Sequence, residues 1–363
     1  MHDGYRVIDT TRHVIEPAGL WDTRLQGPHA GAVQVDAGTG TLTVKGRPVV
    51  RPRPNLMTQD FYKDAFKGAV EAGFTAESNL ADMDREGVDA ATLLPTLGLY
   101  APYADHVDAA LAADVCRAYN DWLHDYCATD AGRLKGVALL ALQDAKEAAT
   151  ELRRAVEELG FVAGLVRPNP VAGRPLHHPA YDLIYGEAES LGVPIVVSEL
   201  GGTVLPEMGV ERFESFFARE AVVDPFEMML AFMSFMGHNV LERFPGLKVG
   251  YLGAGVGWLP YWLDRVDEHW GGYFGDDAPS TLAPSHLFRT QGFASADPWE
   301  HSISDLIVEC GVRTVVWGSQ YPMPEVAPLV PDELGAIVRD ELLTDDQKRA
   351  ILWQNAADLY KIT

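Results

Sequence analysis

The chain has 363 residues, of which 47% are hydrophobic and 22% are charged, as is typical of a soluble globular protein. Its formal net charge of −23 opposes binding to nucleic acid or to an anionic membrane surface, because both would repel it. The three cysteines have no CxxC spacing and no apolar run approaches about 20 residues, so we expect neither a disulfide framework nor a membrane span, and we predict a cytoplasmic protein.

Eight short apolar runs alternate with amphipathic helical stretches along the whole chain. Several runs are almost wholly apolar, as expected of parallel strands buried on both faces. Asp144 and Gly160 are placed to begin and end one intervening helix, and Pro179 and Gly192 another. Eight strands joined by helices predict an α/β fold, the parallel (β/α)8 TIM barrel. The predicted strands span residues 6–10, 89–95, 136–142, 161–167, 194–198, 248–253, 292–296 and 314–318.

Two long loops depart from a minimal barrel. Residues 23–74 form an insertion after the first strand, which we predict lies over the barrel mouth. Within it, residues 32–35 and 41–44, separated by a Gly-Thr-Gly turn, predict a small hairpin. Residues 199–217 form the second loop. Such loops usually shape a pocket, although a packing or dimer contact would explain either one equally well. No linker sets off a second domain, so we predict one domain over residues 1–363.

Polar residues at the predicted strand ends mark the candidate site. In a barrel of this kind, the side chains at the carboxyl ends of the strands face the pocket. The polar residues found there are Thr11, His13, Gln143, Arg167, Asn169, Ser198, Asp297, Gln320 and Tyr321.

The last predicted strand continues into V-V-W-G-S-Q-Y-P-M-P-E, residues 315–325. This segment resembles the motif W-G-S-D-Y-P-H-P-E of the amidohydrolase-related family, the amidohydrolase 2 branch of metal-dependent hydrolases and decarboxylases. The resemblance implies the barrel fold, with the Asp of the motif as a metal ligand and general base. Here Gln320 stands at the Asp position and Met323 at that of the following His. Five further segments look like the family: residues 8–17, 81–89, 116–123, 167–170 and 241–245.

The positions that carry metal ligands in the family have been replaced. The resemblance implies two ligands on the first strand that are separated by one residue, so that alternation turns both toward one ion. Here the first of these positions is Thr11, and only His13 remains. Ser198 stands where relatives have a His at the end of the fifth strand, and Gln320 replaces the Asp. Because these changes remove the imidazole and carboxylate donors that hold zinc or manganese, we predict no metal and no other cofactor.

The remaining groups predict acid–base chemistry. His13 is the expected general acid and base, because its unperturbed pKa lies nearest neutrality. Arg167 would pair with a substrate carboxylate, and Ser198 and Gln320 would donate hydrogen bonds to a developing oxyanion. Glu16, three residues after His13, would orient the imidazole. The candidates for substrate binding are Thr11, Glu16, Asn169, Glu199, Asp297, Tyr321 and Met323.

Our leading hypothesis is a metal-independent enzyme acting on a small carbonyl- or carboxylate-bearing metabolite of aromatic or polyketide-like type. Its reaction would be a decarboxylation, a dehydration, or a condensation and cyclisation. The resemblance is the basis for the substrate class, because relatives act largely on aromatic or enoic carboxylates. It also favours a homodimer or homotetramer.

Two other hypotheses remain open. The first is a catalytically silent barrel that binds a ligand or a partner chain, with Thr11 and Ser198 as space-fillers and His13 as a core histidine. The second is a metal-dependent hydrolase whose ion has moved. That ion would be held by residues from the set His13, Glu16, Glu199, Asp224 and His238. The neighbouring His177 and His178 look like a metal pair, but we expect them to cap the helix that begins at Pro179.

Overall fold

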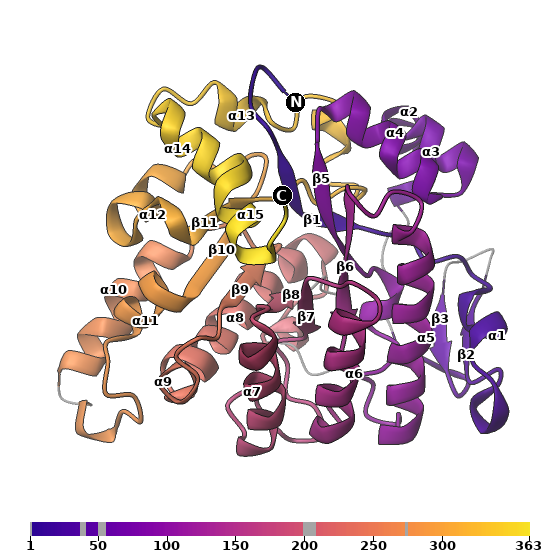
Figure 1. Ribbon diagram of the computed structural model, residues 1–363, viewed down its shortest axis with the longest axis horizontal. Coiled ribbons are helices and arrows are strands. Elements are labelled where there is room, and N and C mark those ends of the chain that lie inside the picture. The colour runs from indigo at the N-terminus through magenta and orange to yellow at the C-terminus, as the bar shows by residue number, and fades with distance from the viewer. Residues whose placement is uncertain (1, 37–40, 50–55, 199–207, 273–274) are drawn as a thin grey trace.

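The computed structural model describes residues 2–36, 41–49, 56–198, 208–272 and 275–363. Eight strands form one parallel sheet in which they follow one another in sequence order, and helices surround this sheet. This arrangement confirms the predicted (β/α)8 barrel (Figure 1). The strands are β1 (Ile8–His13), β5 (Ala90–Leu94), β6 (Leu134–Leu139), β7 (Ala163–Val166), β8 (Ile195–Ser198), β9 (Val249–Leu252), β10 (Gly292–Ala296) and β11 (Val315–Trp317).

Helices α1 to α12 lie between these strands in the chain, and α13 to α15 follow β11. They are α1 (Leu20–Arg24), α2 (Asp60–Ala65), α3 (Lys67–Ala72), α4 (Ala76–Glu86), α5 (Ala109–Cys127), α6 (Ala145–Glu157), α7 (Asp182–Leu191), α8 (Phe216–Met236), α9 (Val240–Arg243), α10 (Leu259–Gly271), α11 (Pro284–Gln291), α12 (Ile303–Cys310), α13 (Gly335–Val338), α14 (Asp345–Arg349) and α15 (Asn355–Tyr360). None of those within the described residues is long and apolar enough to cross a membrane.

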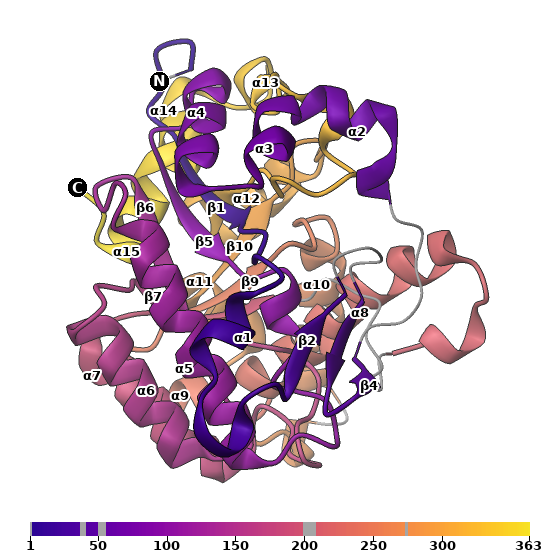
Figure 2. The same ribbon diagram turned by 90° about the vertical axis from the view of Figure 1, so that its right-hand side faces the viewer.

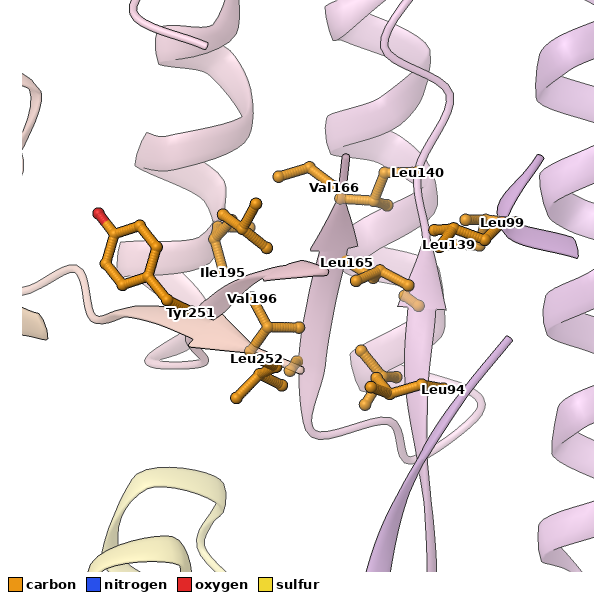
Figure 3. Packing of buried hydrophobic residues seen from close by; sticks show 14 of the residues in the cluster. Leu94, Leu99, Leu139, Leu140, Leu165, Val166, Ile195, Val196, Tyr251 and Leu252 are labelled. Atoms are coloured by element: carbon orange, nitrogen blue, oxygen red, sulfur yellow. The ribbon is translucent and has the colours of Figure 1, made fainter. Parts of the chain in front are cut away.

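Branched aliphatic side chains fill the barrel. Leu94, Leu165, Val196 and Leu252 come from four different strands, and each is fully buried (Figure 3). Strands such as β7 and β8 are almost wholly apolar, as a parallel sheet covered by helices requires. The core therefore holds the carboxyl ends of the strands, which carry the candidate site, in fixed positions.

Local signals in the sequence set the ends of the helices. The carboxylate of Asp144 accepts hydrogen bonds from the amides of Lys146 (3.0 Å) and Glu147 (3.3 Å), so it caps α6 as predicted. Gly192 ends α7 in the left-handed conformation (φ 64°) that glycine adopts without strain.

The paired histidines before α7 have different roles. His178 accepts from the amide of Ala180 (3.2 Å) and caps the turn that leads into α7, as predicted. His177 does not cap that turn in the structure. Its ring stacks on His238 with 3.8 Å between the ring centroids.

The insertion after β1 contains the predicted hairpin. Strands β2 (Val33–Val35) and β3 (Leu42–Val44) pair antiparallel, and β4 (Arg47–Pro48) adds a short third strand. The hairpin lies beside α1 and next to the loop that follows β5 (Figure 2), where the His106 imidazole bonds to the carbonyl of Val44. The turn at residues 37–40 and the first part of the second loop, residues 199–207, lie outside the described residues.

Candidate active site

His13 ends β1 inside the barrel and is 1% exposed. Its Nδ1 lies 2.9 Å from the carbonyl oxygen of Pro95, which makes Nδ1 the protonated nitrogen and leaves Nε2 as the acceptor. Nε2 is buried and has no hydrogen-bond partner among the described residues. Burial lowers the pKa of His13 to about 4, and the bond to Pro95 only partly offsets this effect. The imidazole is therefore neutral at physiological pH and presents a lone pair to the barrel interior.

Gln320 follows β11 in a left-handed conformation with φ 61°. A residue other than glycine is strained there, so surrounding bonds must hold it. The backbone amide of Gln320 donates to Thr11 Oγ1 (3.1 Å), and its side-chain Nε2 donates to Asp297 Oδ1 (3.1 Å). The Gln320 side chain also lies close enough to His13 to oppose the lowering of the histidine pKa. The structure thus brings Thr11, His13, Asp297 and Gln320 together.

The first and last strands meet at a seam beside these residues. Asp9 accepts from the amide of Ser319 (2.9 Å) and also from its hydroxyl, while Thr10 Oγ1 donates to the carbonyl of Trp317 (2.7 Å). The amide of His13 completes the seam by donating to the carbonyl of Tyr321 (2.6 Å). Among the described residues, side chains make most of the hydrogen bonds that join β1 to the segment after β11. Asp9 was missed in the sequence because its partner lies at the far end of the chain.

We expect Gly318→Ala to destabilise the folded protein by about 1–3 kcal/mol and to reduce activity, because a Cβ there would overlap the side chain of Thr11 across the seam. Thermal unfolding followed by circular dichroism measures the change. Gly68→Ala is the control, since nothing lies within 4 Å of its Cβ position in α3. Equal stability of the two variants would contradict the tight seam.

Two carboxylates meet after β10. Asp297 is 6% exposed, and burial raises its pKa to about 7. The hydrogen bond from Gln320 opposes this rise in pKa, whereas the charge of Glu300 adds to it. Glu300 accepts hydrogen bonds from the amides of Val256 (2.8 Å) and Gly257 (3.0 Å), in the loop after β9. Glu300 was not predicted as a site residue. The spacing Asp297-x-x-Glu300, opposite a Gly-rich segment, was the signal that could have drawn attention to it.

Ser198 ends β8 with its hydroxyl buried and without a hydrogen-bond partner among the described residues. The Cβ position of Gly253 lies 3.7 Å from this hydroxyl and 3.1 Å from Gln320 Nε2, so both groups converge on the same point. Arg167 and Asn169 follow β7 and are fully buried, with the Arg167 guanidinium 5.5 Å from the centre of the Tyr100 ring. The predicted oxygen-binding residues therefore all lie buried at strand ends.

Glu16 was predicted to orient the His13 imidazole, but it has other partners in the structure. The Glu16 carboxylate does not contact His13; it accepts from the amides of Thr96 (3.0 Å), Leu97 (2.9 Å) and Gly98 (2.9 Å), and so anchors the loop after β5. The predicted orienting role is corrected accordingly, because the carbonyl of Pro95 holds the imidazole instead.

The side chains of Tyr321 and Met323 have surroundings that differ from those of the Gln320 side chain. The Tyr321 hydroxyl donates to Asp82 Oδ2 (2.8 Å) in α4, and its ring packs edge-on to Phe66 with centroids 5.2 Å apart. Because the chain reverses at Gln320, the next side chain points toward the surrounding helices. Met323 is half-buried, and its amide closes a turn by donating to the carbonyl of Gln320 (2.8 Å). Glu199 lies outside the described residues.

A buried ion cluster lies behind β1. Arg12 is fully buried and donates to Glu86 Oε2 (2.7 Å) and Asn79 Oδ1 (2.6 Å) of α4. Its guanidinium lies 3.7 Å from the centre of the Tyr321 ring and 3.4 Å from Asp9 Oδ2. This cluster supports both sides of the seam, because Arg12 and Asp9 belong to β1 and Tyr321 follows β11.

The donor set does not fit a divalent metal. At the four positions where the family resemblance implies ligands, His13 provides an imidazole, Thr11 and Ser198 provide hydroxyl groups, and Gln320 provides a neutral side-chain amide. Thr11 Oγ1 and Gln320 Nε2 already bond within the protein. No group of three His, Cys, Asp or Glu side chains within the described ranges is arranged to hold an ion. Of the residues proposed for a relocated ion, His238 stacks on His177 and Glu16 bonds to loop amides. Glu199 lies outside the described residues, so the relocated metal site stays a prediction.

Comparison with known proteins shows to which family the chain belongs. The profile of the family described as Amidohydrolase (Amidohydro_2) matches residues 8–362. A gamma-resorcylate decarboxylase from a Polaromonas species is 25% identical over 304 residues, covering 77% of this chain and 85% of that protein. The chain belongs to the amidohydrolase family, and its curated relatives include several decarboxylases of that superfamily.

Solved structures agree on the fold. The 5-carboxyvanillate decarboxylase of Sphingomonas paucimobilis superposes with a TM-score of 0.73 at 20% identity, covering 99% of this chain and 100% of that one. A dihydroxybenzoic acid decarboxylase from Polaromonas, with bound manganese and the inhibitor 2-nitroresorcinol, gives a TM-score of 0.71 at 19% identity, covering 99% and 97%. Both likenesses support the barrel architecture alone.

Proposed function

We propose that the protein is a metal-independent lyase that decarboxylates a small hydroxylated aromatic carboxylate. The carrying observation is the pair of buried polar atoms, His13 Nε2 and Ser198 Oγ, that have no hydrogen-bond partner among the described residues at the carboxyl end of the barrel. Buried polar atoms are nearly always bonded in native proteins, so two unpartnered atoms at the carboxyl end of the barrel support a polar ligand there. The names of a gamma-resorcylate decarboxylase and a 2,6-dihydroxybenzoate decarboxylase among the similar proteins supply the substrate class.

The substrate would be held through its oxygen atoms. The ring hydroxyl would donate to His13 Nε2, which is an acceptor in the tautomer fixed by Pro95. The carboxylate would take hydrogen bonds from Ser198 and from the buried guanidinium of Arg167. Gln320 stands beside both groups and would fix the plane of the ring.

His13 would serve as a weak base. A pKa of about 4 would be too low to deprotonate a resting phenol. Once the ring carbon bearing the carboxylate is protonated, however, the hydroxyl proton becomes strongly acidic and a weak base is sufficient. The bond to the carboxyl carbon then breaks, CO2 leaves, and its electron pair restores the aromatic ring. His13 returns its proton to the ring oxygen.

The proposal predicts that chelation leaves activity unchanged. The protein would be expressed with zinc, manganese and iron available, and metal content measured by elemental mass spectrometry. CO2 release from 2,6-dihydroxybenzoate and 5-carboxyvanillate would be assayed before and after dialysis against EDTA. We expect substoichiometric metal and the same rate, because the described donors do not fit an ion.

A variant that restores the residue types of the family provides the control. Thr11→Asp, Ser198→His and Gln320→Asp, combined in one chain, should take up manganese in the same preparation. Near-stoichiometric metal in the unmodified protein, with activity lost on chelation and restored by manganese, would contradict the proposal.

A further inference from the structure

The proposed decarboxylation needs a group that delivers a proton to the ring carbon, and His13 acts there as a base. We infer that Asp297 is this proton donor, and that Glu300 is a positioning residue that holds Asp297 in its protonated form. The inference rests on the proposed function and adds two carboxylates to it.

The geometry places the Asp297 carboxyl at the edge of the site. Its Oδ1 is bonded to Gln320 Nε2 (3.1 Å), and the same Gln320 side chain lies next to His13. The donor and the base would therefore stand on two sides of one amide. A substrate ring that bonds to His13 through its hydroxyl would present a neighbouring ring carbon toward Asp297.

Glu300 is fixed next to Asp297 by the loop after β9. Its two carboxylate oxygens accept from the amides of Val256 and Gly257. A Cβ on Gly255 would overlap Glu300 Oε2 and lie 3.4 Å from Asp297 Oδ2, so both carboxylates face this one glycine. The left-handed conformation of Gly255 (φ 63°) also favours glycine at this position. The loop thus brings the two acids together in a way that a larger residue would prevent.

Two neighbouring carboxylates do not readily ionise together, because each charge raises the free energy of the other. Burial raises the pKa of Glu300, and the hydrogen bonds from the amides of Val256 and Gly257 oppose that rise by favouring its ionised form. Asp297 is more deeply buried and has one amide donor, so it is the member expected to keep the proton. The charged or titratable groups that face Asp297 in the described structure are Glu300 from its own loop and, through Gln320, the neutral His13 of β1.

The proton transfers balance with water as the only reactant besides the substrate. Asp297 gives its proton to the ring carbon that carries the carboxylate, and the hydroxyl proton passes to His13. The carbon–carbon bond breaks and CO2 leaves. His13 then returns its proton to the ring oxygen, and Asp297 takes a proton from water. The net change is one proton consumed and one CO2 released for each carboxylate.

The first test is the pH dependence of kcat/KM for decarboxylation of 2,6-dihydroxybenzoate. Since protonated Asp297 is the active form, activity should fall as pH rises above about 7. Glu300→Gln removes a negative charge, lowers the pKa of Asp297 and should move this fall by about one pH unit to lower pH. Asp297→Asn should reduce kcat on the order of 10²–10⁴-fold with little change in KM.

Glu242→Gln is the matched control. Glu242 also accepts backbone hydrogen bonds, from the amides of Thr281 (2.7 Å) and Leu282 (3.1 Å), but in the α9 segment before β9. Its loss should leave the pH profile in place. A second readout needs no substrate: ¹³C NMR titration of labelled carboxyl groups, with Asp297 assigned by Asp297→Asn. We expect a midpoint near 7 that falls in Glu300→Gln.

The outcomes separate the two levels of the proposal. Full turnover by Asp297→Asn would overturn the inference and leave the proposed function intact. An Asp297 midpoint below 5 that is the same in Glu300→Gln would overturn the role of Glu300. Failure of the unmodified protein to release CO2 from any hydroxybenzoate would overturn the proposed function, and with it the catalytic role of Asp297.

Discussion

Replacing Arg12 by methionine is expected to destabilise the folded protein by roughly 3–5 kcal/mol. The guanidinium is fully buried and donates to Glu86 (2.7 Å), with Asp9 at 3.4 Å. Methionine fills a similar volume but leaves these carboxylates without their cation in a medium of low dielectric constant. Removing one partner of a buried ion pair costs more than the pair contributes, because the remaining charge is then unpaired. Urea unfolding at pH 7.5 measures the loss.

Arg85→Met is the control, because Arg85 is 37% exposed in its side chain and pairs with Asp82 (3.1 Å) from the solvent side. Its loss should cost no more than about 1 kcal/mol. The penalty at Arg12 should shrink as pH falls. Burial raises the pKa of Glu86 and Arg12 opposes that rise, so without Arg12 the carboxyl takes up a proton more readily and the uncompensated charge disappears. Equal losses for both variants at every pH would contradict a buried cluster.

Turnover by His13→Ala is expected to fall on the order of 10²–10⁴-fold, the range typical of a lost general acid or base. Binding of 2-nitroresorcinol, measured by titration calorimetry, should weaken far less, because Ser198, Arg167 and Gln320 remain to hold the oxygen atoms. His238→Ala is the control: it removes an imidazole that stacks on His177 outside the barrel, and should keep normal turnover.

The same pair of measurements tests the silent-barrel hypothesis. A protein that only binds its ligand would show no turnover before the change, and His13→Ala would bind the ligand as the unmodified chain does. A catalyst that depends on His13 loses rate while keeping affinity. Unchanged turnover in His13→Ala would contradict the proposed role of the imidazole.

Much of the fold could be predicted from the sequence because its signals are local. A buried parallel strand is a short apolar run, and a helix end carries its own cap, as Asp144 and Gly192 show. The positions of His13, Ser198 and Gln320 at strand ends followed from this pattern together with the family resemblance. The homodimer or homotetramer remains a prediction.

The side-chain partners could not be predicted, because they depend on contacts between distant segments. Glu16 is three residues from His13, but the loop amides after β5 lie nearer to its carboxylate. Tyr321 adjoins Gln320, but the positive φ of Gln320 turns the next side chain away. The proximity of Glu300 to Gly255 could not be predicted either, because Gly255 lies 45 positions earlier in the chain, in the loop after β9.

The seam between β1 and β11 also determines when the site can form during synthesis. Thr11 and Gln320, which bond across it, are 309 residues apart in the chain. The nascent polypeptide therefore carries His13 through almost the whole of translation before the segment that completes the site leaves the ribosome. A chain with seven strands in place and most of its helices formed would still lack Gln320 beside His13. Formation of the candidate site in this protein thus coincides with closure of the ring.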